Sequence, residues 1–98
     1  MGENISLGAD AMARLDFSST DQVMTAAHGG AVDALFELGL MYSTGRDVSA
    51  DLVAAHKWFN LAAMRGNDEA KRLRLEISRE LSKKQIADAQ RQAREWLR

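Results

Sequence analysis

A repeat of small residues at a spacing of 36 positions constrains this chain more than any other feature. When the sequence is shifted by 36 positions, four of nine residues in segment 26–34 coincide with segment 62–70. The coinciding residues are all Ala or Gly: Ala26, Ala27, Gly30 and Ala34 fall on Ala62, Ala63, Gly66 and Ala70. Paired Ala lets two helices approach closely, and Gly ends a helix before the next one starts. The spacing predicts a helical unit that occurs more than once.

The composition favours a chain that is helical throughout. It has 16 Ala and 11 Leu against 7 Val plus Ile and no Pro, and the first two are strong helix formers. The absence of Cys excludes disulfides, thiolate zinc sites and cysteine nucleophiles. No secretory signal is recognisable, and no apolar run approaches the roughly 18 residues that a membrane helix needs. We expect one small domain in a bacterial-type cytoplasm, without a membrane partner.

Capping residues and apolar stripes delimit the expected helices. Ser19 and Ser82 each begin an S-x-x-Q capping box, and Asp51 is a favourable N-cap. The expected helices span about residues 20–28, 31–43, 52–65 and 69–81, and a last helix after Ser82 has Trp96 and Leu97 on its apolar stripe. Short connections predict antiparallel hairpins, so the expected fold is all-α, a short α-solenoid.

The residues of segment 34–70 carry a resemblance to a known family. They follow one pattern in type and spacing: Ala34-x-x-x-Leu38-Gly39-x-x-Tyr42-x-x-Gly45-x-x-Val48-x-x-Asp51-x-x-x-Ala55-x-x-Trp58-Phe59-x-x-Ala62-Ala63-x-x-Gly66-x-x-x-Ala70. This pattern resembles the Sel-one-like repeat family, which is related to tetratricopeptide repeats. Asp47 departs from it, because the family usually has a second loop Gly there. Asp tolerates the left-handed conformation, so we expect the loop to form.

The repeat pattern divides the chain into segments. Residues 1–18 are expected to form an N-terminal arm, and residues 19–98 a helical repeat domain. Within that domain we expect a half repeat over 19–30, a full repeat over 31–67 and a degenerate hairpin over 68–98. One period after Leu38, Gly39 and Tyr42 come Arg74, Leu75 and Ser78. The last pair therefore lacks the close-contact Gly, and we expect it to cap the array.

Candidate catalytic and metal-binding residues are few. His28 and His56 have no carboxylate at a recognised metal spacing, and we expect His56 to face solvent. Asp33 and Glu37 are one helical turn apart, but acidic residues early in a helix suit its dipole. Neither pair is accompanied by a nucleophile. We predict a protein that is not an enzyme and has no metal or other cofactor.

Apolar residues off the expected packing stripes predict a partner-binding surface. In stacked helical repeats the first helix of each pair lines the concave face, and such a surface can grip an apolar segment of a partner. The residues predicted to bind a partner are Phe36, Leu40, Met41, Leu61 and Met64. The alternative is that the N-terminal arm, with Met12, Leu15 and Phe17, folds back and covers this surface.

Charge is distributed unevenly along the chain. Residues 1–64 carry 3 Lys/Arg and 8 Asp/Glu, whereas residues 65–98 carry 10 and 6. We expect five basic residues of the C-terminal hairpin to steer an acidic partner: Arg72, Arg74, Arg79, Lys83 and Lys84. The same hairpin has interleaved acids, such as Glu76 four residues after Arg72, and no aromatic platform for bases. This pattern disfavours nucleic-acid binding.

These observations predict a protein–protein interaction module or adaptor, in line with the scaffolding role that the resemblance implies. Self-association is the alternative, since fewer than three full repeats usually cannot bury a continuous core. A homodimer is the simplest such assembly. Two further readings are weaker: nucleic-acid binding by the basic hairpin, and the β-lactam hydrolysis linked to some cysteine-rich relatives of this repeat family. The sequence does not name the partner.

Overall fold

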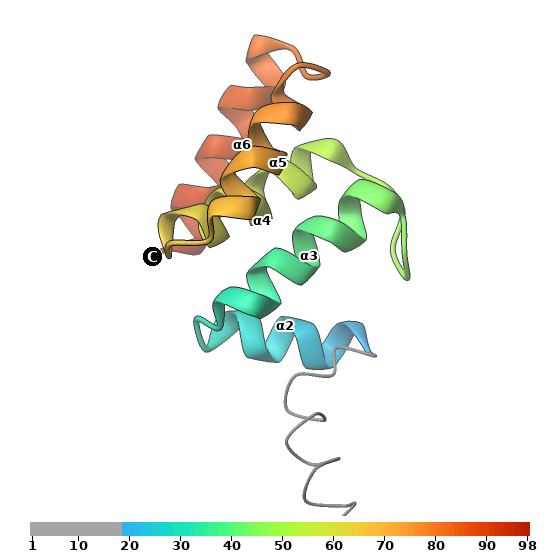
Figure 1. Cartoon of the computed structure of the whole chain (residues 1–98), viewed down its shortest axis with the longest axis vertical. Coiled ribbons are helices and arrows are strands. Elements are labelled where there is room, and N and C mark those ends of the chain that lie inside the picture. The colour runs from blue at the N-terminus through green and yellow to red at the C-terminus, as the bar shows by residue number, and fades with distance from the viewer. Residues whose placement is uncertain (1–18) are drawn as a thin grey trace, which may run out of the picture.

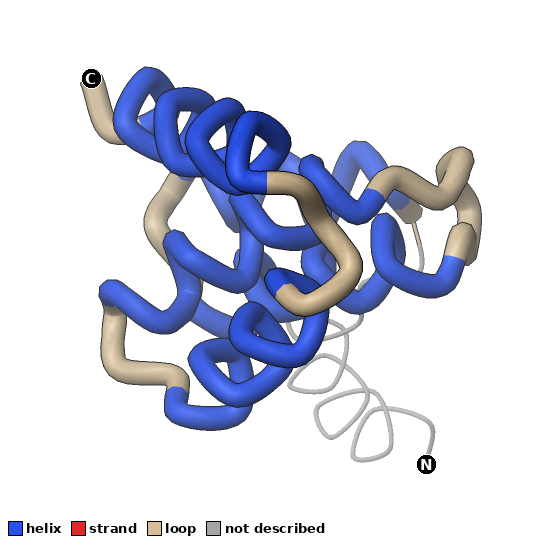
Figure 2. Tube along the Cα trace, turned by 90° about the horizontal axis from the view of Figure 1, so that it is seen from above, coloured by secondary structure: helices blue, strands red, loops and turns tan. Residues whose placement is uncertain are grey.

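The computed structural model describes residues 19–98, which form five helices and no strand (Figure 1, Figure 2). The helices are α2 (Thr20–His28), α3 (Val32–Thr44), α4 (Leu52–Met64), α5 (Asp68–Ser78) and α6 (Lys83–Trp96). The all-α repeat architecture predicted from the sequence is confirmed. The predicted N-terminal arm lies outside the described residues.

Side-chain caps explain where the helices begin. The side chains of Ser19, Asp51, Asn67 and Ser82 accept hydrogen bonds from backbone N–H groups of α2, α4, α5 and α6, respectively. Each bond satisfies a donor that a helix N-terminus otherwise leaves without a partner. At Ser82 the full capping box forms, since the Gln85 side chain also accepts from the Ser82 N–H at 2.9 Å. Helix α5 ends at Ser78, one turn earlier than predicted, because α6 is capped by Ser82.

The loop between α3 and α4 uses two left-handed residues. Gly45 ends α3 with a φ of 78°, and Asp47 adopts a φ of 64°. The Asp51 N–H then donates to the Tyr42 carbonyl at 2.9 Å, which holds the loop against the end of α3. The expectation that Asp47 could replace a loop Gly is confirmed.

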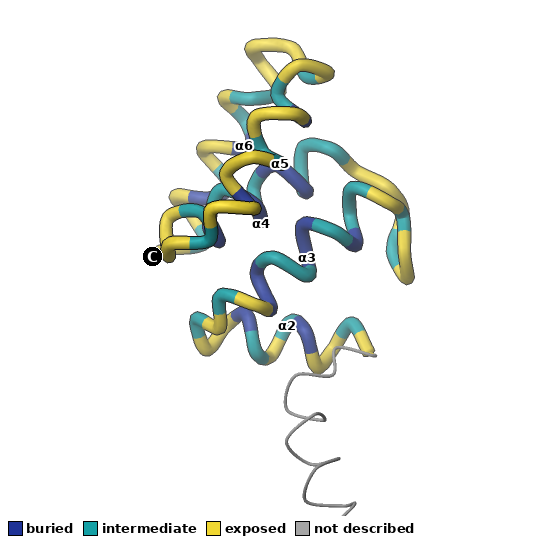
Figure 3. The backbone as a smooth tube through the Cα atoms, in the orientation of Figure 1, coloured by how far each residue is buried: buried dark blue, intermediate teal, exposed yellow. Residues whose placement is uncertain are grey.

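Helix α4 lies at the centre of the packing. It contacts α3, α5 and α6, while α2 packs against α3. The core comprises residues such as Leu35 and Leu38 of α3, Trp58, Phe59 and Leu61 of α4, and Ile77 of α5. Figure 3 shows buried stretches along α3, between α2 and the later helices. Because α4 has neighbours on three sides, its buried surface is wider than one apolar stripe.

The second helical pair, α5 and α6, packs less closely than the first pair, α3 and α4. In α3, Gly39 leaves space for the ring of Phe59, whose atoms occupy the position that a Cβ would need. The residue one period later is Leu75, which has a side chain where the first pair has none. Helix α6 packs mainly on α4, and its backbone approaches α5 far less than α4 approaches α3. Leu75 is 51% exposed as a result, and Leu97 at the end of α6 is also exposed, contrary to its predicted place in the core.

Candidate functional site

A groove lies where α3, α4 and α5 meet. Its volume is about 320 Å³. We call this the α3–α5 groove, and its lining is mostly apolar at the floor with polar groups at the edge: Leu40, Ser43, Thr44, Leu52, Phe59, Leu73, Glu76, Ile77 and Glu80. Helices α3 and α5 are the first helices of their pairs. Of the five residues predicted to bind a partner, Leu40 lines this groove.

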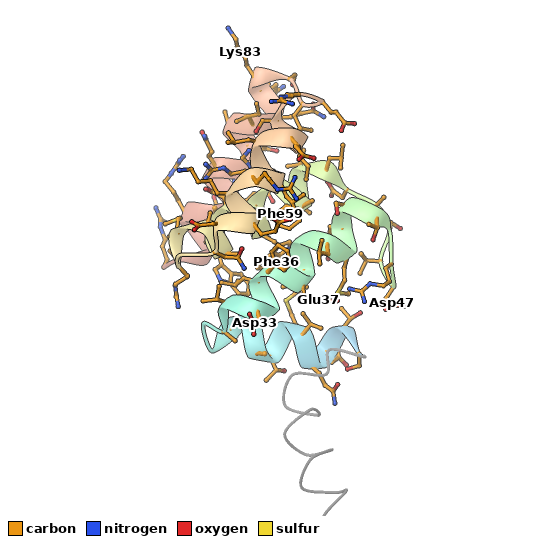
Figure 4. All side chains as sticks on the ribbon, in the orientation of Figure 1. Asp33, Phe36, Glu37, Asp47, Phe59 and Lys83 are labelled. Atoms are coloured by element: carbon orange, nitrogen blue, oxygen red, sulfur yellow. The ribbon has the colours of Figure 1, made fainter. Side chains whose placement is uncertain are left out.

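The aromatic residues at the groove hold its floor in place. The rings of Phe36 and Phe59 are tilted at 53° with their centroids 5.6 Å apart. Figure 4 shows both side chains in the space between α3 and the second pair. Such a pair contributes about 0.5–1.5 kcal/mol beyond the apolar area that it buries. Phe36 is half-buried and Phe59 is fully buried, so Phe36 supports Phe59 from the α3 side.

The predicted partner-binding residues are placed differently from one another. Leu40 lines the groove, and Phe36 packs beside it on Phe59. Met64 is 59% exposed and is not part of the groove lining. Met41 and Leu61 are each only 1% exposed and belong to the core, so the prediction that they form a contact surface is wrong. The reason is that α3 packs between α2 and α4, and α4 packs between three helices, which buries residues off the main stripes.

The charges at the edge of the groove are acidic. Glu76 lies on the same face of α5 as Leu73 and Ile77, and Glu80 follows in the turn after α5. Glu76 forms an ion pair with Arg72, which also pairs with Glu69. Glu80 takes part in no ion pair within residues 19–98. The groove thus presents one uncompensated carboxylate beside an apolar floor.

The five predicted steering residues fall into two groups. Arg72 is held by Glu69 and Glu76, and Arg74 donates from Nη1 to the Asn60 side chain at 2.7 Å. The other three, Arg79, Lys83 and Lys84, are exposed around the turn between α5 and α6 and form no ion pair in the described part of the chain. Figure 4 places Lys83 at the far tip of the second pair. Among these five residues, the positive charge without an internal partner in residues 19–98 is therefore concentrated at this tip.

His56 is buried, which corrects the prediction that it faces solvent. Its side chain is 2% exposed, and its Nε2 lies 3.0 Å from Ser78 Oγ. Ser78 donates its own hydroxyl proton to the Arg74 carbonyl, so His56 Nε2 donates to Ser78. Burial, and to a lesser degree the charge of Arg74, lower the pKa of His56. This side chain acts as a neutral link between α4 and α5.

A second aromatic cluster joins α2, α4 and α6. His28 stacks on Trp96 with ring centroids 4.4 Å apart, and Trp96 meets Trp58 edge-on at 4.7 Å. Lys57 Nζ lies 4.1 Å from the centre of the Trp58 ring, a distance typical of a cation–π contact. Burial lowers the pKa of Lys57, whereas Asp51 and Glu95 oppose that shift. An open depression of about 530 Å³ beside this cluster is lined by Lys57, Arg91, Gln92, Glu95 and Trp96.

Sequence reasoning missed the α5 side of the groove. Leu73, Glu76, Ile77 and Glu80 follow the spacing of one helical face, and this signal was available. Placing α5 beside α3, as repeat stacking requires, identifies that face as the second wall.

No group of three or more metal-binding side chains occurs within residues 19–98. The helices described are all too short or too polar to cross a membrane.

Residues 32–67 match the family model of the Sel1 repeat. Over this segment the chain contains a Sel1 repeat. The matched segment coincides with α3, α4 and the turn that leads into α5, and includes the Gly39–Phe59 contact. The resemblance predicted from the residues of segment 34–70 is confirmed.

One curated protein that is similar to this chain is the alginate biosynthesis protein AlgK of Azotobacter vinelandii. The two are 33% identical over 82 residues, which cover 78% of this chain. The aligned region is 18% of AlgK, so the chain spans less than a fifth of that relative. No solved structure matches the chain. Sel1 repeats generally mediate protein–protein interaction.

Proposed function

We propose that this chain is a non-enzymatic adaptor that binds a segment of a partner protein in the α3–α5 groove. The observation that carries the proposal is the groove itself, an apolar floor between the first helices of two successive pairs. Leu40 of α3 and Leu73 of α5 both line it and are half-buried. Burying one apolar side chain against them would contribute about 1.5–3 kcal/mol.

The charge at the groove edge defines the partner segment further. Glu80 has no internal counter-ion among the described residues, whereas Glu76 is neutralised by Arg72. A Lys or Arg one turn from the inserted apolar residue would pair with Glu80. The fitting segment is therefore an amphipathic stretch with apolar anchors and a flanking basic residue.

The basic tip has a separate role in this proposal. Arg79, Lys83 and Lys84 are exposed and attract acidic regions of the same partner outside the inserted segment. Such attraction raises the association rate and is screened by salt over about 8–10 Å. Arg72 and Arg74, already bound internally, contribute less.

The test starts from peptides selected for binding to the full chain from a random display library. Selected peptides are titrated by calorimetry against the wild type, Leu40→Ala, Glu80→Lys and the control Met64→Ala. We expect at least tenfold weaker binding for the first two variants and unchanged binding for the control, whose side chain lies outside the groove. Circular dichroism verifies that each variant remains helical.

Glu80→Lys keeps this test informative if Leu40→Ala loses stability, because Glu80 is exposed. Peptides selected with acidic instead of basic flanks would contradict the charge assignment. Equal affinity of the wild type, Leu40→Ala and Glu80→Lys for all selected peptides would overturn the groove as the binding site.

A further inference from the structure

We propose that the α3–α5 groove of one molecule receives the exposed face of α5 from a second copy of this chain. That face is the Leu75 stripe, defined as Lys71, Leu75 and Arg79. The inference rests on the proposed function of the groove as a binding surface, and it names the occupant.

The Leu75 stripe has the chemistry that the groove requires. Leu75 is 51% exposed, and Lys71 and Arg79 are placed one helical turn before and after it. Neither basic side chain forms an ion pair within residues 19–98, and both are exposed. Leu75 therefore fits the apolar floor of the groove, and the basic side chains beside it can pair with Glu80.

The exposure of Leu75 has an identifiable cause. The equivalent residue in the first pair is Gly39, which Phe59 of the following helix covers. Helix α6 packs on α4 and makes little contact with α5, so Leu75 is left uncovered. The second pair thus has an uncovered leucine, Leu75, at the position where the first pair has Gly39.

The groove and the stripe lie on different sides of α5. Leu73, Glu76 and Ile77 share the groove face, whereas Leu75 projects roughly 150° away at 100° per residue. A molecule therefore cannot fill its own groove with its own stripe. When two copies bind, one contributes its groove and the other its Leu75 stripe. The stripe of the first copy and the groove of the second copy remain free. Heterologous contacts of this kind add copies end to end.

The overall charge distribution supports the same arrangement. Residues 19–64 carry five Asp/Glu and two Lys/Arg, and residues 65–98 carry six and ten. When the basic second pair of one copy approaches the first pair of the next, opposite net charges meet. Association is then expected to weaken as salt concentration rises.

The experiment measures molar mass by light scattering over a concentration series of the full chain. We expect the wild type to grow beyond a dimer at low salt and to return toward the monomer at high salt. Leu75→Gln should weaken association at least tenfold. Met64→Gln removes another exposed apolar side chain, outside both surfaces, and should leave association unchanged.

Mixing two variants tests the geometry. Leu75→Gln retains a working groove, and the double variant Leu40→Ala with Glu80→Lys retains a working stripe. Each alone should be monomeric, and an equimolar mixture should stop at a dimer because only one productive contact remains. Lys71→Glu mixed with Glu80→Lys should recover growth, since both contacts in an alternating chain are then charge-matched.

Three results would overturn the inference. They are a wild type that stays monomeric at every concentration, an equal loss of association in Met64→Gln and Leu75→Gln, and a mixture that does not form dimers. A monomeric wild type that still binds selected basic peptides in the groove would refute self-association and leave the proposed adaptor function standing. A wild type that neither self-associates nor binds the selected peptides would refute both the self-association and the adaptor function.

Discussion

The ring of Phe59 lies directly on the backbone of Gly39, where a side chain would otherwise begin. This contact sets the separation of α3 and α4. It also places Phe59 where it can form the floor of the α3–α5 groove and contact Phe36. One glycine therefore links the packing of the repeat to the shape of its candidate binding site.

Gly39→Ala should destabilise the protein. The new methyl group overlaps the Phe59 ring, and forcing an extra carbon into a packed core costs about 1–3 kcal/mol. Denaturant unfolding measures the change. Gly29→Ala is the matched control, because its Cβ would meet only ordinary contacts and its φ is −76°. Equal stability of Gly39→Ala and the wild type would contradict the packing argument.

Asp47 offers a test of backbone conformation. Its φ of 64° suits Gly best, tolerates Asp and penalises β-branched residues. Asp47→Gly should leave stability unchanged or raise it, and Asp47→Val should lower it by about 1–2 kcal/mol. The neighbouring residue Val48 has no positive φ, so Val48→Thr should show no comparable backbone effect. Thermal unfolding of the three variants distinguishes these outcomes.

His56 makes stability depend on pH. Burial lowers the pKa of His56 in the folded state, whereas the unfolded chain has the ordinary value of about 6.5. Below that pH the unfolded state binds a proton that the folded state resists, so the free energy of unfolding falls as pH decreases. Above it both states are neutral and this contribution is constant. Urea unfolding between pH 7.5 and 5.5 should show the decrease.

The control for this pH effect is His28→Gln, which removes an exposed imidazole and should keep the decrease. His56→Gln should remove it, because the amide can still donate to Ser78 but does not titrate. A decrease of the same size in His56→Gln would assign it to other groups.

Trp96 should matter more to stability than the adjacent Leu97. Trp96 connects α6 to Trp58 of α4 and to His28 of α2, so Trp96→Ala removes contacts among three helices. For a half-buried aromatic residue we expect a loss of about 2 kcal/mol. Leu97 is 48% exposed, and Leu97→Ala should change stability by less than about 0.5 kcal/mol. Similar losses for both variants would show that the aromatic cluster does not anchor α6.

The sequence predicts the helices and their order well because the signals for them are local. Ser19, Asp51 and Ser82 cap helices through side-chain bonds that span three residues. The spacing of Ala and Gly also predicts the repeat, because close helix contacts require small side chains at fixed intervals. Such features need no knowledge of distant packing.

Burial off the main stripes could not be predicted in the same way. Met41, Leu61 and His56 lie on faces of α3 and α4 that a two-helix hairpin would leave exposed. They are buried because each helix has additional neighbours from other pairs. For the same reason the sequence predicts Leu40 at this surface but not Leu73 or Glu80, which line the groove because α5 lies beside α3.

The substitution of Leu75 for a close-contact glycine also affects how the molecule opens. Helix α6 is attached mainly through α4, so its detachment breaks fewer contacts than separation of α3 from α4. Its amide hydrogens should exchange with solvent through local fluctuations, while those of α3 and α4 exchange only with global unfolding. The array would then lose order from its C-terminal end inward, one helix at a time.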